Sequence, residues 1–112
     1  MLRKAWIIAV LAITVAVALP GLAKSDEAYI AAANRVIDTI VQIATERIQN
    51  ADTYEEMLFW AQWADFHVRL VLARLERKIG PVEYEVSYVT VYNEKVGCSV
   101  TFDPIHVIGS GG

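Results

Sequence analysis

The stretch that decides the fold runs from Thr53 to Pro81 and reads TYEEMLFWAQWADFHVRLVLARLERKIGP. Thr53 and Glu56 form a capping box, in which the two side chains satisfy amides at the start of a helix. Gly80 and Pro81 end the helix, because Gly fits the left-handed position after a helix and Pro cannot continue one. The sequence therefore predicts one long helix between these two signals.

This predicted helix is apolar on two sides. At about 100° per residue, small and aliphatic side chains form a first stripe of Met57, Ala61, Ala64, Val68, Val71, Leu75 and Ile79. A second stripe contains Phe59, Trp63, Phe66 and Leu70, flanked by Trp60 and His67. A helix that is apolar on two sides must lie between two layers. We expect a helix on the first stripe and a sheet or another chain on the second.

The residues before Thr53 predict another helix, from about Asp26 to Ala51, with Ser25 as its N-cap. Its aliphatic residues share one face and its charged and amide residues share the other, so one side packs and the other is wet. Because only a few residues connect the two helices, they should be antiparallel neighbours.

The residues after Pro81 predict strands. Val82 to Tyr92 is β-branched and aromatic, with alternate tyrosines and valines on one face and Glu83 and Glu85 on the other. Val89 and Val91 break that polar face, which predicts that something covers them. We take residues 93–97 as a turn and Cys98 to Asp103 as the returning strand.

Pro104 interrupts the ladder, so Ile105 to Ile108 is expected to form at best a short edge strand. The predicted fold class is α+β, with an antiparallel helical hairpin followed by a small antiparallel β-hairpin or three-stranded meander packed on the second helix. The domain spans residues 24–108, and residues 109–112 form a flexible tail rich in glycine.

Residues 1–23 have the three-part organisation of a secretory signal peptide. Arg3 and Lys4 precede an apolar run from Ala5 to Leu19, and a helix-breaking Pro20 and small residues precede a cleavage site after Ala23. The predicted location is therefore outside the cytoplasm, in a periplasm or the extracellular space. The alternative is a membrane anchor through residues 5–23, although an apolar run of about 15 residues is short for a span.

The charge balance excludes a class of partner. Loss of Arg3 and Lys4 with the leader leaves eight basic against thirteen acidic residues, a net charge of −5. A modestly acidic domain has no electrostatic footprint for nucleic acid or for an anionic membrane. We expect no nucleic-acid partner, and contact with a membrane only if the leader is retained.

The single cysteine, Cys98, rules out a disulfide within the chain. It alternates with apolar residues of its strand, so we expect a buried free thiol. Together with Asp103, His106 and His67 it has the ligand types of a zinc site, but the spacing matches no zinc pattern. We expect no metal and no cofactor.

No catalytic motif is present: there is no nucleophile elbow, glycine-rich phosphate loop or paired metal-binding histidines. The favoured hypothesis is an exported, non-catalytic structural or partner-binding module that forms a homodimer or binds an envelope protein. The alternative is a small ligand-binding or hydrolytic envelope protein that uses an aromatic surface of Trp60, Trp63 and His67.

Overall fold

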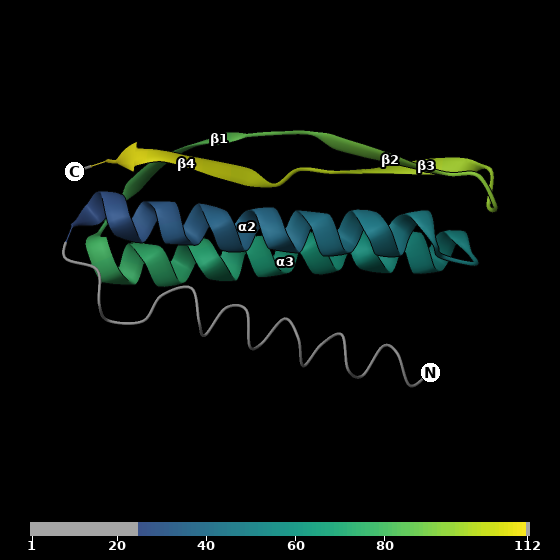
Figure 1. Cartoon of the computed structure of the whole chain (residues 1–112), viewed down its shortest axis with the longest axis horizontal. Coiled ribbons are helices and arrows are strands. Elements are labelled where there is room, and N and C mark those ends of the chain that lie inside the picture. Colours follow the sequence, from purple (N-terminus) through teal and green to yellow (C-terminus); the bar gives the residue numbers. More distant parts are fainter. Residues whose placement is uncertain (1–24, 112) are drawn as a thin grey trace.

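The computed structural model describes residues 25–111, so the predicted leader and its cleavage site lie outside the described residues. Two helices precede four strands: α2 (Asp26–Gln49), α3 (Tyr54–Ile79), β1 (Val82–Val86), β2 (Val89–Asn93), β3 (Cys98–Phe102) and β4 (Ile105–Ser110). The strands lie lengthwise along the helix pair (Figure 1). The predicted α+β architecture, a helical hairpin followed by antiparallel strands, is confirmed.

The helix ends form as the caps predict. Ser25 Oγ accepts a hydrogen bond from the Ala28 amide at 3.2 Å, and Thr53 Oγ1 accepts one from the Glu56 amide at 3.1 Å. Glu56 Oε1 in turn accepts from the amide of Asp52. At the end of α3, Gly80 has φ +87° and donates its amide to the Glu76 carbonyl, which closes the last turn.

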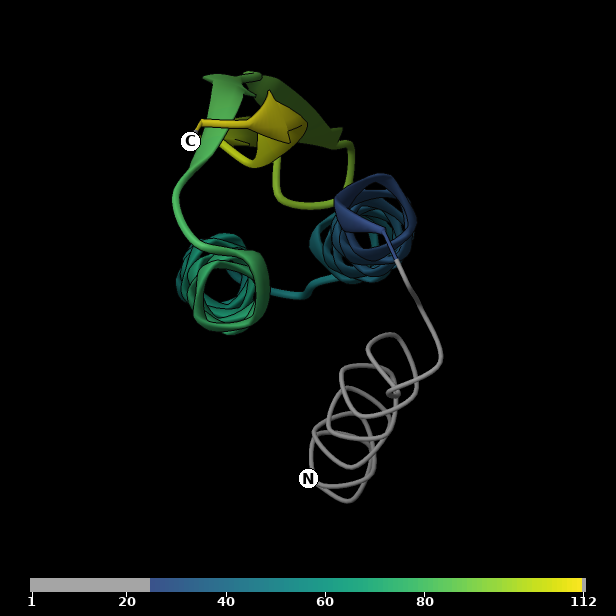
Figure 2. The ribbon, with the colours of Figure 1, turned by 90° about the vertical axis from the view of Figure 1, so that its left-hand side faces the viewer.

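The two helices are antiparallel, and the core begins between them (Figure 2). The first stripe of α3 is buried against the aliphatic face of α2. Ala44 of α2 and Ala61 and Ala64 of α3 are among the buried residues, and small side chains there allow the helices to approach closely. The strands lie over one side of the helix pair and pack on both helices (Figure 2).

The four strands form one long two-stranded ribbon. β1 pairs with β4 and β2 with β3, both antiparallel. One register continues through the interruption, since Val89 faces Phe102 in one half and Val86 faces Ile105 in the other. Between the halves, the Ser87 amide donates to the Pro104 carbonyl at 2.8 Å.

The ribbon differs from the predicted strands in length. The stretch from Val82 to Tyr92 is divided into two strands at residues 87–88, and Ile105 begins a full strand rather than a short edge piece. Gly109 and Ser110, expected in the flexible tail, pair with β1.

The ribbon turns over at its interruption. Val91 and Val100 face the helices from β2 and β3, and in the other half Val107 of β4 faces them. β2 and β4 both pack on α2, while β3 packs on α3, so the strands exchange sides as well as faces. The strong right-handed twist of two-stranded ribbons accounts for this.

The turn of the ribbon at its interruption contradicts one expectation from the sequence. Val89 and Val91 were predicted on the same face as Glu83 and Glu85, but Val91 is buried and Val89 packs against the core. The prediction of their face was wrong because the alternation of helix-facing and outward-facing residues changes phase between the two halves of the ribbon. The chain itself therefore covers these valines, and they need no partner molecule.

Two asparagines tie the ribbon to α2. Asn93, fully buried, donates its Nδ2 to the carbonyls of Ile48 and Ala51 and accepts the Val96 amide. Asn34 of α2 forms two hydrogen bonds of 2.9 Å with the backbone N–H and C=O of Val107, as a neighbouring strand would. Each half of the ribbon thus has one polar attachment to the same helix.

Candidate functional site

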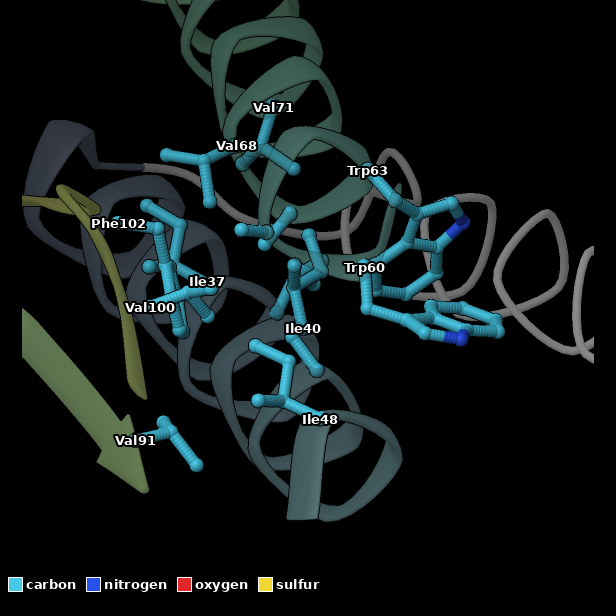
Figure 3. Close-up of a cluster of buried hydrophobic side chains, with 14 of the residues drawn as sticks. Ile37, Ile40, Ile48, Trp60, Trp63, Val68, Val71, Val91, Val100 and Phe102 are labelled. Atoms are coloured by element: carbon cyan, nitrogen blue, oxygen red, sulfur yellow. The ribbon is translucent and has the colours of Figure 1, made fainter. Parts of the chain in front are cut away.

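The predicted aromatic surface lies on the side of the hairpin that faces away from the ribbon. Figure 3 shows Trp60 and Trp63 across the helix pair from the strand that carries Val91. The ribbon meets α3 along a different line, where Cys98 Sγ lies 4.0 Å from Met57 Sδ and Asp65 Oδ1 accepts the Asp103 amide. The sheet therefore covers the first stripe together with α2, and not the aromatic stripe.

The aromatic side chains of α3 form a continuous ladder of ring contacts. Phe59, Trp60, Trp63, His67 and Phe66 follow one another with ring centroids 5.0–5.2 Å apart. Most of the contacts are edge-to-face, the arrangement that aromatic quadrupoles favour. The ladder fixes the orientation of both indoles and of the imidazole.

Burial differs sharply along this ladder. Trp60 and Trp63 are 1% and 6% exposed, whereas Phe66 is 58% exposed and His67 is half-buried. The Nε1–H of Trp63 is buried without an acceptor among the described residues. The assignment of Trp60, Trp63 and His67 as a binding surface therefore stays a prediction.

His67 is held as a neutral ring with one defined tautomer. Its Nδ1 lies 2.8 Å from the Trp63 carbonyl, and because a carbonyl can only accept, Nδ1 carries the proton. Burial lowers the pKa of His67, and the hydrogen bond to that carbonyl opposes the shift. Nε2 is left as an acceptor, so the ladder combines apolar surface with one ring-nitrogen acceptor.

The other predicted chemical groups lie apart. Cys98, only half-buried, faces Met57 on the ribbon side, whereas His67 lies among the aromatic rings on α3. Across residues 25–111, no three His, Cys, Asp or Glu side chains come together in a way that could hold a metal ion. The structure thus does not assemble Cys98, Asp103, His106 and His67 into one site.

A set of exposed apolar side chains was not recognised as a surface from the sequence. The most exposed large hydrophobic residues are Tyr54, Phe59, Phe66, Leu70, Tyr84, Val86, Tyr88, Tyr92 and Ile108. They fall into two groups, one on α3 and one on the ribbon. For the group on α3, the second apolar stripe in the sequence was the signal. For the group on the ribbon, the change of phase between the two halves hid which side chains would be exposed.

Comparison of the chain with protein-family models, with curated proteins and with solved structures found no match. None of the helices in residues 25–111 has the length and apolarity needed to cross a bilayer.

Proposed function

We propose that this protein is an exported, non-catalytic module that acts by binding another protein, either a second copy of itself or an envelope protein. The exposed apolar side chains of the described residues support this. Tyr88 is 75% exposed, and Tyr92 and Ile108 are each more than half exposed on the same ribbon. Single exposed apolar residues are ordinary, but we take several of them along one ribbon as a sign of a protein-binding surface.

The ribbon also offers backbone groups to a partner. Within residues 25–111 it has two strands at every level, so each strand has one edge that pairs with no other described strand. Such edges bind extended segments of other proteins by strand addition. Glu83 and Glu85 on β1 would lie opposite like charges if two copies of that edge paired antiparallel, which disfavours self-pairing there.

Export is supported by the leader grammar of residues 1–23. Expression of the full chain in a bacterial host, followed by fractionation and intact mass, tests it. A mature chain that begins at Lys24 is the expected product. A chain that retains Trp6 and stays with the membrane fraction would replace the exported module by an anchored one.

Site-specific photocrosslinking tests partner binding. A photoreactive amino acid at Tyr88 or Tyr92 should give a discrete crosslinked protein in the envelope fraction. The same amino acid at Asp38, exposed on the polar face of α2, is the matched control and should give none. Equal yields at the ribbon and control positions would contradict a binding role for the ribbon.

The alternative is a small ligand-binding or hydrolytic protein that uses Trp60, Trp63 and His67. The buried Nε1–H of Trp63 without a described acceptor favours it. After removal of the leader these are the chain's two tryptophans, so their fluorescence reports on this surface alone. Saturable binding of anilinonaphthalene sulfonate that Trp63→Phe abolishes would support the alternative, and an unchanged spectrum would oppose it.

A further inference from the structure

The side of α3 that faces away from α2 carries an exposed apolar line. Phe66 and Leu70 are exposed, and Phe59 and Ala73 continue the same line one or two turns away. In Figure 2 no other described element lies against this side of α3. The ribbon lies over the helix pair and does not cover this side of α3.

When a second copy of the helix is reversed about Phe66, two residues of this line, Phe59 and Ala73, fall opposite each other, while Leu70 falls opposite Gln62. Phe66 lies at the middle of α3, which runs from Tyr54 to Ile79. A two-fold axis through Phe66 places Phe59 opposite Ala73 of a second copy, so a large side chain meets a small one on each side of the axis. Facing large and small residues allow two helices to pack without voids.

The charges of the helix follow the same symmetry. Its first turn is acidic, with Glu55 and Glu56, and its last turn is basic, with Arg77 and Lys78. Antiparallel pairing centred on Phe66 brings Glu55 beside Arg77 of the second copy, and does so twice. It also sets the two helix dipoles antiparallel, with opposite partial charges side by side, whereas parallel pairing would place like charges together.

We propose that the protein is a symmetric homodimer in which α3 packs antiparallel against α3 of a second copy, with Phe66 on the two-fold axis. This inference rests on the proposed binding role and identifies the partner as a second copy. Other self-contacts are less suited, since Val89 and Val91 are covered within the chain and the β1 edge carries Glu83 and Glu85.

Light scattering of the mature chain, from low to high micromolar concentration, is the first test. The expected mass is twice that of one chain. Phe66→Asp should raise the dissociation constant at least about tenfold, and its thermal unfolding should show a native fold because Phe66 is exposed. Gln42→Asp, on the exposed polar face of α2, is the matched control and should remain dimeric.

A charge reversal tests the orientation of the helices. Glu55→Arg and Arg77→Glu should each weaken the dimer, because each places like charges together at both ends of the contact. The double variant re-forms both pairs with opposite sign and should recover most of the lost affinity. Failure of this rescue, with each single variant weakened, would overturn the antiparallel register.

A disulfide crosslink at the proposed two-fold axis tests which residues of the two copies meet there. In a Cys98→Ser background, Phe66→Cys should oxidise to a disulfide dimer, since the two-fold axis brings the same residue of both copies together. A monomeric wild-type chain at high micromolar concentration, or a Phe66→Asp variant that stays dimeric, overturns the proposal. The photocrosslinks from Tyr88 and Tyr92 to an envelope protein are measured separately. Failure of the dimer proposal would therefore leave the proposed binding of another protein standing.

Discussion

The two halves of the ribbon meet the helices differently. In the β2–β3 half both strands lie over a helix, and Val91, Val100 and Phe102 are buried. In the β1–β4 half β4 packs on α2, with Val107 buried, whereas Tyr84 on the neighbouring strand remains 46% exposed. Tyr84 is opposite Val107 in the ladder and shares its face.

The difference shows how a hairpin of two helices limits what a twisted ribbon can bury. A ribbon that lies straight along the groove covers both helices, but one that turns over carries one strand beyond them. Apolar side chains on the helix-facing side of that strand then stay in contact with water. The β1–β4 half should therefore be the less stable part of the same cooperative fold.

The largest expected effect is the loss of a buried ring in the tighter half. Phe102→Ala should lower the free energy of unfolding by about 3–5 kcal/mol, because it opens a cavity under β3. Tyr84→Ala is the matched change in the looser half and should cost less than about 1 kcal/mol. Urea denaturation of both variants measures the contrast, and similar losses would show that the halves are equally packed.

The next effect comes from the buried attachment at Asn93. Asn93→Ala should cost about 2–4 kcal/mol, since it removes three hydrogen bonds and leaves carbonyls at the end of α2 buried without their donor. Thermal unfolding followed by circular dichroism gives the loss. A change below that of an exposed variant such as Thr90→Ala would show that water replaces the amide.

The corresponding attachment in the β1–β4 half, Asn34, should contribute less to global stability than Asn93. Its loss should open mainly its own half of the ribbon. Asn34→Ala should cost about 1–2 kcal/mol, because the two hydrogen bonds to Val107 are only partly buried. Hydrogen exchange should accelerate at amides of β1 and β4 and stay slow in β2 and β3. Uniform acceleration throughout the ribbon would mean that the halves open as one unit.

A smaller effect on stability is expected as the pH falls, through His67 in the helical hairpin on which both halves of the ribbon lie. Burial lowers the pKa of His67 below its usual 6.5, so the unfolded chain takes up a proton first as the pH falls. Stability should then drop as the pH falls through and below 6.5, and His67→Gln should remove part of that drop, less than about 1 kcal/mol. His106→Gln, on the exposed face of β4, is the control. An identical slope in wild type and His67→Gln would contradict the burial of the ring.

The smallest effect lies at the junction of the halves. Burial raises the pKa of Asp65, and the nearby Asp103 carboxylate adds to the shift, while the Asp103 amide opposes it. An acid whose pKa is raised by folding destabilises the fold above its unfolded pKa and not below it. Asp65→Asn should therefore raise stability slightly at neutral pH, by about 0.5 kcal/mol, and leave it unchanged near pH 3. A loss at neutral pH would mean that the charge on Asp65 strengthens the hydrogen bond.

Local patterns were enough to predict the helices and their order. Ser25, Thr53 and Gly80 mark helix ends through contacts within a few residues, and such signals are readable in one sequence. The strand alternation was also readable, but its change of phase was not. That change depends on twist accumulated between two strands, and Ser87 and Pro104 meet only after the chain has folded back.

The site could be anticipated only in part. Both stripes of α3 are apolar, and a single sequence does not show which of them the ribbon covers. The polar attachments were missed for a related reason: Asn34 looks like an ordinary helical residue and Asn93 like an ordinary turn residue. Their partners, Val107 and Ile48, lie far away in the chain and become visible only in the fold.

The crossing of the ribbon has a consequence for how the gene can vary. Two residues separate the strands on each side, at positions 87–88 and 103–104. Deleting one of them would shift every pair in half of the ribbon by one residue. Deleting one on each side would restore the pairing but, if the ribbon still turned over at this point, would bring Glu83 and Glu85 to its helix-facing side. Substitutions should therefore be tolerated at Ser87 and Tyr88, whereas changes in length at this point should be among the rarest viable alleles.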